Sequence, residues 1–379
     1  MSFLYEGLTM ITWQQVFMYV VGGILIYLAI KKELEPSLLL PMGFGAILVN
    51  IPLSGAVNQV MEGIGDVHGI LDWMFEVGIK ASEALPLILF IGIGAMIDFG
   101  PLLCNPKLLL LGASAQFGIF MTITVAAFLG FDIKDAASVG IIGAADGPTS
   151  ILVSQVLGSK HIGAIAVAAY SYMALVPIIQ PIAIKLSTTK KDRAIAMSYN
   201  PKNVTKLTRI LFPIVVTIVA GLVAPASVSL VGFLMFGNLI RECGVLSTMS
   251  NTAQKELANL ITLVLGITIS ASMKAENFVN IETLLIMCLG LLAFIFDTIA
   301  GVMFTKFLNL FMKEKINPMV GAAGISAFPM SARVVQKMGL EANSQNHLLM
   351  HAVGANVSGQ IASVVAGGVI LGLVPALIK

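Results

Sequence analysis

The chain has 379 residues, of which 57% are hydrophobic and only 11% are charged, and its mean hydropathy is +0.94. Soluble domains carry about 25% charged residues, so this composition excludes an ordinary water-soluble enzyme. The net charge of +2 gives no indication of a nucleic-acid partner, and we expect none. Three widely spaced cysteines predict neither a disulfide framework nor a cysteine metal site.

Apolar segments of near-bilayer length recur along the chain. They predict an all-α polytopic membrane protein, a single membrane domain with about 9 to 11 transmembrane or re-entrant segments. Three further stretches, rich in Gly, Ala, Ser and Asn, are too polar to face lipid, so we expect them inside protein or beside a cavity. The apolar segments cover residues 13–30, 37–57, 85–104, 108–130, 161–184, 210–236, 257–272 and 283–308, and the more polar stretches cover 137–157, 317–335 and 347–372.

Charged residues in the connections predict the orientation, because Lys and Arg accumulate on the cytoplasmic side. Residues 185–209 hold seven basic residues and one acid, so this loop should be cytoplasmic. Residues 58–84 hold five acids and one lysine, so this connection should face outward. Threading the spans between these markers makes residues 137–157 enter and leave on one side. If an earlier span is miscounted, the same residues form a broken helix that crosses the membrane.

Two short matches at nearly one offset indicate a diverged internal repeat, although small residues also match by chance. NPKLLLLGASA, which begins at Asn105, recurs 212 residues later as NPMVGAAGISA. GAADG, which begins at Gly143, recurs 211 residues later as GANVS. We therefore expect two halves, residues 1–185 and 210–379, joined by a basic cytoplasmic loop at 186–209.

The strongest local signal is the carboxylate of Asp146 within GIIGAADGPTSI. A charged carboxylate at membrane depth costs roughly 2.5 to 3.5 kcal/mol, so it needs a cation, a proton or a polar partner. Gly147-Pro148 breaks the helix there and frees backbone carbonyls, and a dehydrated Na+ needs such hard oxygen ligands. The alternative is that Asp146 only caps a helix that begins at Pro148. In a membrane protein we favour the ion site.

A second motif, KINPMVGAAGISAFPMSARVV, combines oxygens with a cation. Asn317 and Ser326 offer oxygens, Gly321 allows close backbone approach, and the guanidinium of Arg333 can hold a carboxylate through two hydrogen bonds. The alternative is that Asn317 caps a helix and Arg333 extends from a helix end towards water.

Other polar residues lie in apolar spans. Tyr170 and Tyr172 stand in AAYSYMALVPIIQP, where a buried phenol can relay a proton but is equally well an interface anchor. Asp98 and Asp297 each serve equally well as a partner for a cation or as a hydrogen-bonding group within the bundle.

These motifs resemble the β subunit of the sodium-pumping, biotin-dependent decarboxylases, a family that includes the oxaloacetate, methylmalonyl-CoA and glutaconyl-CoA enzymes. The resemblance extends from about residue 37 to the end and rests on GAADGPTSI, YSYMALVPIIQP, GITISASMKAENF and KINPMVGAAGISAFPMSARVVQKMG followed by HLLMHAVGANVSG. It implies a multi-pass protein of the bacterial cytoplasmic membrane with an inverted-repeat, elevator-type fold and broken helices. It also implies that the chain decarboxylates carboxybiotin, consumes a proton and exports Na+.

The resemblance also implies roles for individual residues. The Na+ site falls on Asp146, Asn317, Gly321 and Ser326, the proton relay on Tyr172, and the group that binds the carboxylate of carboxybiotin on Arg333. Asp146, Tyr172 and Arg333 would carry the catalysis.

The chain has no recognisable biotinyl-lysine motif, so we expect carboxybiotin to be supplied in trans. The expected partners are a carboxyltransferase subunit, a biotin carrier subunit, a small membrane-anchored subunit, further copies of the chain in a homo-oligomer, and membrane lipid. The carboxyltransferase, and not this chain, would select the acid or acyl-CoA. The alternative function is a free-standing Na+-coupled secondary transporter or Na+/H+ antiporter, which the ion motif fits equally well.

Overall fold

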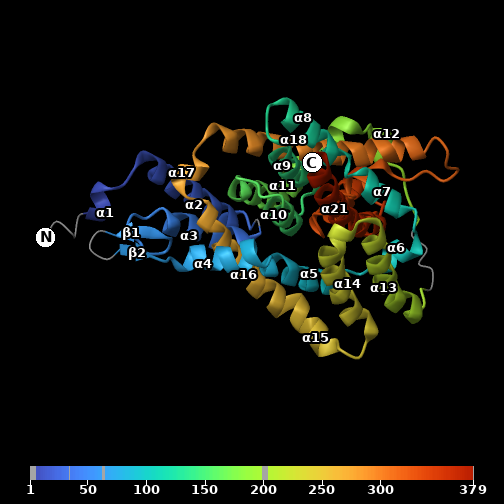
Figure 1. Ribbon diagram of the computed structural model, residues 1–379. Coiled ribbons are helices and arrows are strands. Elements are labelled where there is room, and N and C mark those ends of the chain that lie inside the picture. Colours follow the sequence, from blue (N-terminus) through green and yellow to red (C-terminus); the bar gives the residue numbers. More distant parts are fainter. Residues whose placement is uncertain (1–5, 34, 62–64, 199–203, 379) are drawn as a thin grey trace.

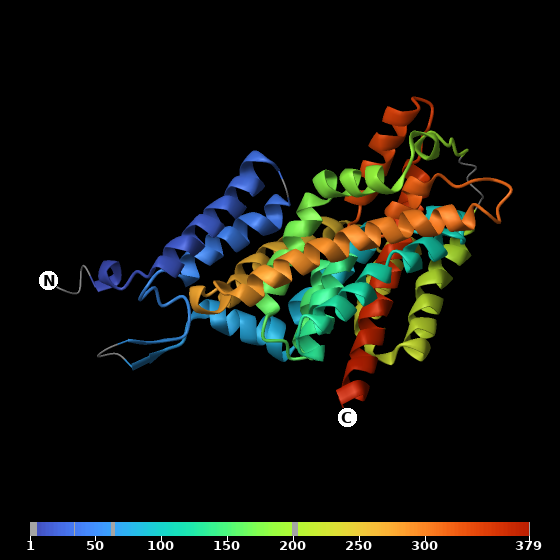
Figure 2. The same cartoon turned by 90° about the horizontal axis from the view of Figure 1, so that it is seen from above.

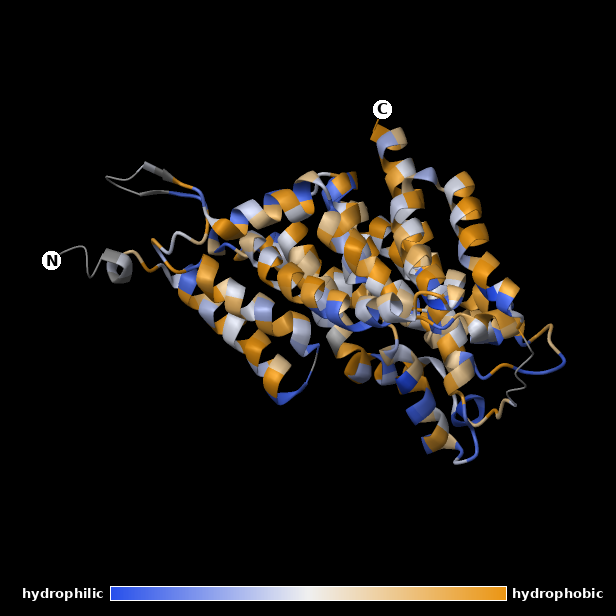
Figure 3. Cartoon of the chain, turned by 90° about the horizontal axis from the view of Figure 1, so that it is seen from below, coloured by the Kyte–Doolittle hydropathy of each residue, from blue (hydrophilic) through white to orange (hydrophobic). Residues whose placement is uncertain are grey.

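The computed structural model describes residues 6–33, 35–61, 65–198 and 204–378. Within these ranges the regular structure is helical apart from one β hairpin, so the predicted all-α class is confirmed. Seven described helices are long and apolar enough to cross a membrane, and two bent helix pairs raise that number to nine. Hydrophobic residues cover the helices, whereas hydrophilic residues gather towards the connections (Figure 3). The chain is therefore a multi-pass membrane protein.

The N-terminal helices form one end of the molecule (Figures 1 and 2). α2 (Trp13–Lys31) packs against α3 (Pro36–Val49) with Gly22 and Gly43 at the crossing. A Cβ atom at either glycine would lie 2.6 or 2.7 Å from the carbonyl oxygen of the other, so only small residues allow this approach. The other elements of this end are α1 (Glu6–Thr9), the antiparallel strands β1 (Gln59–Met61) and β2 (Gly65–Val67), and α17 (Ala275–Phe278).

One predicted segment, residues 210–236, is wrong because the structure divides it into two helices. α13 (Lys206–Val223) ends before Pro225, and α14 (Val228–Cys243) packs back against it. Pro225 cannot donate the backbone hydrogen bond that would continue α13. The turn η4 (Pro225–Ser227) carries no charge, so hydropathy alone runs through it.

The remaining helices surround the centre of the molecule. α18 (Ile281–Leu308) crosses it as a 28-residue helix, drawn in orange in Figure 2. It packs against α8 (Phe117–Phe128), α11 (Ile162–Ser187) and α19 (Pro318–Ala322). The predicted segment 257–272 begins earlier than expected, because residues 247–272 form one candidate span. The other bounds are α4 (Ile70–Phe75), η2 (Glu76–Ala81), α5 (Ala84–Met96), α6 (Gly100–Cys104), α7 (Leu108–Ser114), α8 (Phe117–Phe128), α11 (Ile162–Ser187), α12 (Lys190–Arg193), α15 (Ser247–Thr252), η5 (Ala253–Leu257), α16 (Ala258–Ile269), η6 (Ser270–Ser272) and α21 (Leu349–Ile378).

Two re-entrant hairpins enter this bundle. The first hairpin contains α9 (Ile133–Gly140), η3 (Ile141–Ala144) and α10 (Gly147–Val156). The Ser159 hydroxyl donates to the Asp135 carboxylate at 2.7 Å, so the two ends of this hairpin meet. The prediction that residues 137–157 enter and leave on one side is therefore confirmed.

The second hairpin contains α19 (Pro318–Ala322) and α20 (Met330–Ala342). Its ends also meet, because the amides of Asn317 and Asn346 both donate to the Ile195 carbonyl oxygen, at 2.8 and 2.9 Å. Ile195 belongs to the basic loop, so the second hairpin opens towards that loop.

The two hairpins open on opposite sides of the molecule. Lys306, near the end of α18, forms an ion pair with Asp192 of the basic loop at 2.9 Å. At the start of α18, Glu282 lies 3.3 Å from His161, which follows the first hairpin. We call these sides the basic face and the acidic face. The side of each connection agrees with the predicted threading.

The register of the predicted repeat differs from the structure. The motif that begins at Asn105 leads into a candidate span, Leu108–Phe128, whereas its match at Asn317 begins a re-entrant hairpin. The two hairpins resemble each other in shape and in their opposed orientation, and sequence matching paired neither with the other. The division into halves therefore stays a prediction, with the hairpins as its natural anchors.

Candidate ion and anion sites

The tips of the two hairpins meet in the interior. The backbone N–H of Ser326 in the second hairpin donates to the carbonyl oxygen of Ala144 in the first, at 3.0 Å. Both hairpins interrupt their helices at this point, because Asp146 begins α10 and Pro329 precedes α20. Unpaired polar groups of the hairpin tips therefore collect at one place inside the bundle.

Asp146 is buried at this junction, with 3% of its surface exposed. Its Oδ2 accepts hydrogen bonds from the hydroxyls of Thr149 at 2.8 Å and of Ser363 at 3.1 Å. Its Oδ1 accepts only the long 3.5 Å contact from the Thr149 backbone N–H. Asp146 is thus the helix cap that the alternative reading required. The weak contact still leaves Oδ1 with the capacity to bind a cation.

A cavity of about 200 Å³ lies beside Asp146, and we call it the inner cavity. Ser326, Gln360 and Tyr170 also line it. The amide nitrogen of Gln360 donates to the Ser326 carbonyl oxygen, which leaves the Gln360 Oε1 without a partner among the described residues. The Tyr170 hydroxyl likewise has no described partner. The cavity thus offers one carboxylate oxygen and several neutral oxygens, a donor set suited to a hard cation.

The charge of the inner cavity also favours a cation. Two carboxylates, Asp146 and Glu35, line it, and no Lys, Arg or His is among its described lining residues. Gln254, Asn259 and Thr262 complete its polar wall from η5 and α16. A site with this lining attracts Na+ and repels anions.

A second cavity, of about 610 Å³, opens on the basic face, and we call it the basic-face cavity. Its cations come from two helices: Lys185 from α11, and Arg333 and Lys337 from one side of α20. Arg333 is exposed, and no ion pair engages it within the described part of the chain. The Arg333 guanidinium is therefore available to bind the carboxylate of a molecule that enters from this face.

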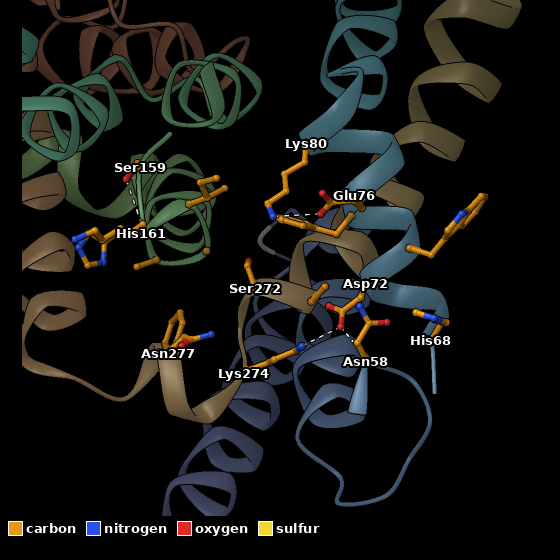
Figure 4. A pocket seen from close by; sticks show the side chains of 18 residues that line it. Asn58, His68, Asp72, Glu76, Lys80, Ser159, His161, Ser272, Lys274 and Asn277 are labelled. Atoms are coloured by element: carbon orange, nitrogen blue, oxygen red, sulfur yellow. Dashed lines mark hydrogen bonds and ion pairs between the residues drawn. The ribbon is translucent and has the colours of Figure 1, made fainter. Parts of the chain in front are cut away.

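A third cavity, of about 690 Å³, opens on the acidic face (Figure 4). Four of its charged side chains form two ion pairs: Lys274 binds Asp72 at 2.9 Å, and Lys80 binds Glu76 at 3.2 Å. Lys160 lines the cavity as well and adds a positive charge beyond these pairs. The cavity is a wide vestibule on the side where the first hairpin opens.

The structure brings some predicted site residues together and separates others. Asp146 and Ser326 share the inner cavity, and Arg333 lines the basic-face cavity. Asn317, Gly321 and Tyr172 line neither.

The three separated residues make other contacts. The Asn317 amide donates to the carbonyl oxygens of Arg193 and Ile195, at 2.9 and 2.8 Å. Gly321 packs directly against the backbone of Gly301, so hairpin and α18 are in close contact there. The Tyr172 hydroxyl donates to the Met287 carbonyl oxygen.

Asp98 and Asp297, the two other carboxylates noted in apolar spans, have structural roles. Asp297 Oδ1 accepts from the backbone N–H of Gly118, at the start of α8, so it caps that helix after its break. Asp98 pairs with Arg209 at 3.5 Å and Arg241 at 3.9 Å near the basic face. The contact of Asp297 favours a hydrogen-bonding role, whereas the ion pairs of Asp98 make it a partner for cationic side chains.

Comparison with known proteins agrees with this arrangement. Residues 14–374 match the family described as Na+-transporting oxaloacetate decarboxylase beta subunit. The chain is 47% identical over 369 residues to the glutaconyl-CoA decarboxylase subunit beta of Acidaminococcus fermentans, with 97% of this chain and 96% of that one covered. It belongs to this family.

Other members of the family are equally similar. The methylmalonyl-CoA decarboxylase subunit beta of Veillonella parvula is 48% identical over 368 residues, with 97% of this chain and 95% of that one covered. The probable oxaloacetate decarboxylase beta chain of Vibrio cholerae is 44% identical over 419 residues, with 96% of each chain covered. The resemblance drawn from the motifs is confirmed. Relatives named for three different substrates match this β subunit almost equally well, so overall similarity does not select a substrate.

Sequence reasoning missed the contribution of α21 to the surroundings of Asp146. Gln360 and Ser363 face Asp146 from this helix, although Ser363 lies 217 residues from it in sequence. Asn356 is fully buried one helical turn before Gln360 and donates to the Ile325 carbonyl oxygen beside the second tip. The available signal was the helical spacing of three polar residues in an otherwise apolar stretch.

Proposed function

We propose that this β subunit decarboxylates carboxybiotin and couples the release of CO2 to the export of Na+ across the bacterial cytoplasmic membrane. One observation supports this most directly. A cavity whose described lining has two carboxylates and no basic residue lies next to a cavity with three basic residues, so a cation and an anionic substrate could be held side by side. Family membership supplies the decarboxylase context.

The anion would bind in the basic-face cavity. Arg333 would hold the carboxylate of carboxybiotin through two parallel hydrogen bonds, and Lys185 and Lys337 would add positive charge at the mouth. Carboxybiotin loses CO2 when the bond between its ring nitrogen and the carboxylate carbon breaks, and that nitrogen then takes up a proton. A residue that carries a proton is therefore needed in the same place. Tyr172, the candidate implied by the resemblance, stays a prediction.

Na+ would bind in the inner cavity. Asp146 would supply the charged oxygen, and Ser326 and Gln360 would supply neutral ones. Asn317 and Gly321 would act on the second hairpin, whose tip carries Ser326. Moving one Na+ against 100 mV costs about 2.3 kcal/mol, so an exergonic reaction must be coupled to the movement. Decarboxylation is the reaction that the family name provides.

The proposal requires partners that supply carboxybiotin. A carboxyltransferase subunit and a biotin carrier would load the carboxyl group and present it at the basic face, where the cavity opens. A small membrane-anchored subunit and further copies of the chain would complete the complex. The vestibule on the acidic face would release Na+.

The decisive experiment reconstitutes the purified complex in liposomes and adds carboxybiotin. We expect decarboxylation to depend on Na+ and to drive uptake of radioactive Na+. Decarboxylation whose rate does not depend on Na+, without uptake of radioactive Na+, would contradict the proposal. Na+ movement that responds to a pH gradient but not to carboxybiotin would favour the antiporter alternative.

A further inference from the structure

One residue joins the two cavities. Glu35 lies in the connection between α2 and α3, at the position that precedes the first turn of α3. Of the described residues that line the inner cavity or the basic-face cavity, Glu35 alone lines both. Its backbone has a φ of 39°, a left-handed conformation that is uncommon for a residue other than glycine. The fold therefore holds this side chain at the junction despite a local conformational cost.

The carboxyl group of Glu35 is half-buried and has no hydrogen bond or ion pair with any described residue. Burial raises the pKa of Glu35, so this carboxyl keeps its proton to a higher pH than an exposed glutamate does. On the inner side it shares the cavity lining with Asp146 and with Tyr170, whose hydroxyl has no described partner. On the basic-face side, the charged residues that line the same cavity are Glu33, Lys185, Arg333, Lys337 and Glu341.

The proposed reaction needs a proton donor near Arg333. Tyr172 lines neither cavity, and its hydroxyl already donates to a backbone carbonyl. Tyr170 lines only the inner cavity. Lys185 and Lys337 are exposed at the mouth of the basic-face cavity, where their ammonium groups would compete with Arg333 for the carboxylate. Glu33 and Glu341 line the basic-face cavity but not the inner cavity, so Glu35 is the described acid that lines both.

We propose that Glu35 is the proton donor in decarboxylation, a role that rests on the proposed function. As the bond from the biotin nitrogen to the carboxylate carbon breaks, its electron pair takes the proton of the Glu35 carboxyl. CO2 leaves, the nitrogen becomes N–H, and Glu35 remains as a carboxylate. A proton from solvent at the basic face then restores it, so one proton is consumed for each CO2.

This role couples the chemistry to the ion. Proton transfer leaves a new negative charge on Glu35 at the entrance to the inner cavity. That charge attracts Na+ towards Asp146 at the moment when the negative charge of the substrate carboxylate disappears. Chemistry in one cavity thereby changes the cation affinity of the next.

The test compares Glu35→Gln with the control Glu314→Gln in the reconstituted complex, with free carboxybiotin as substrate. Glu314 is an exposed glutamate that lines neither cavity. We expect Glu35→Gln to lower kcat at saturating Na+ by about 100-fold or more, as loss of a general acid does. We expect the wild-type rate to fall as rising pH deprotonates Glu35, and Glu35→Gln should remove that fall. Glu314→Gln should keep the wild-type kcat and pH profile.

Three results would overturn the role of Glu35 while leaving the proposed function intact. These are a wild-type kcat and pH profile in Glu35→Gln, an increase only in the Na+ KM of Glu35→Gln, and an equal loss of kcat in Glu314→Gln. If Glu35→Gln does not assemble, Glu35→Asp decides, because it should retain turnover and keep an alkaline fall in rate. A Glu35→Asp variant without that fall would overturn the role. A wild-type complex that cannot decarboxylate carboxybiotin would instead overturn the proposed function itself.

Discussion

Replacing Asp146 by Asn separates its two roles in the structure, because Asn keeps the size and the capacity to cap but removes the charge. Both hydroxyl contacts end on Oδ2, so the amide oxygen of Asn can take that position and accept from both, and only the long contact from the Thr149 N–H is lost. We expect the folded protein to lose only about 1 kcal/mol, the usual net value of a hydrogen bond. The variant should therefore insert and assemble.

The effect on Na+ should be much larger. Unit charges about 4 Å apart interact by about 4 kcal/mol when the effective dielectric constant is about 20. Since every 1.4 kcal/mol is a factor of ten, Na+ affinity should fall by about 10²- to 10³-fold. Within the described protein, Oδ1 accepts only one long contact. Few interactions with the protein therefore compensate for the loss of the carboxylate charge.

The assay measures Na+-dependent decarboxylation and radioactive Na+ uptake over a wide range of Na+ concentration. Asp297→Asn is the control, because it removes another fully buried carboxylate that caps α8 and lines neither cavity. We expect the control to lower thermal stability and to leave the Na+ KM unchanged. Wild-type turnover and Na+ KM in Asp146→Asn would refute the ion site and return Asp146 to the role of helix cap.

Three further predictions test the surroundings of the site. Arg333→Lys keeps the charge but loses the two-pronged geometry, so we expect decarboxylation to slow about 10- to 100-fold, and a wild-type rate would exclude a bidentate contact. Asn317→Ala removes two hydrogen bonds to the basic loop, so thermal stability should fall without a change in the Na+ KM, whereas a raised KM would support Asn317 as a ligand. Burial raises the pKa of Asp192, but hydrogen bonds from Thr189 and Lys306 outweigh it and leave the pKa below its usual range. The ion pair therefore stabilises the folded protein fully at pH values above that usual range. We expect Asp192→Asn to melt at a lower temperature than wild type at neutral pH, and the two melting temperatures to converge as acid protonates Asp192. Melting temperatures that do not converge would contradict this account.

Local sequence signals located much of the architecture. Charge in the connections placed the basic loop and the acidic connection on opposite sides, and it followed that residues 137–157 are re-entrant. Hydropathy failed at residues 210–236, because the Pro225 turn has no charged residue to interrupt the apolar run. The repeat matches pair elements of different shape, because short runs of small residues recur in both, and the division into halves stays a prediction.

The sequence by itself determined the membrane class, the sidedness of the connections, and the points where helices break, including those at Asp146 and ahead of Arg333. These features follow from residues that are neighbours along the chain: apolar length, local charge, and Gly or Pro in a helix. Only the tertiary structure decided which oxygens face Asp146, because Gln360 and Ser363 come from a helix more than 200 residues away and reach it through packing. The tertiary structure also decided that Asn317 contacts the basic loop and that Glu35 lies between two cavities. Both positions depend on how distant helices pack and not on the residues beside them.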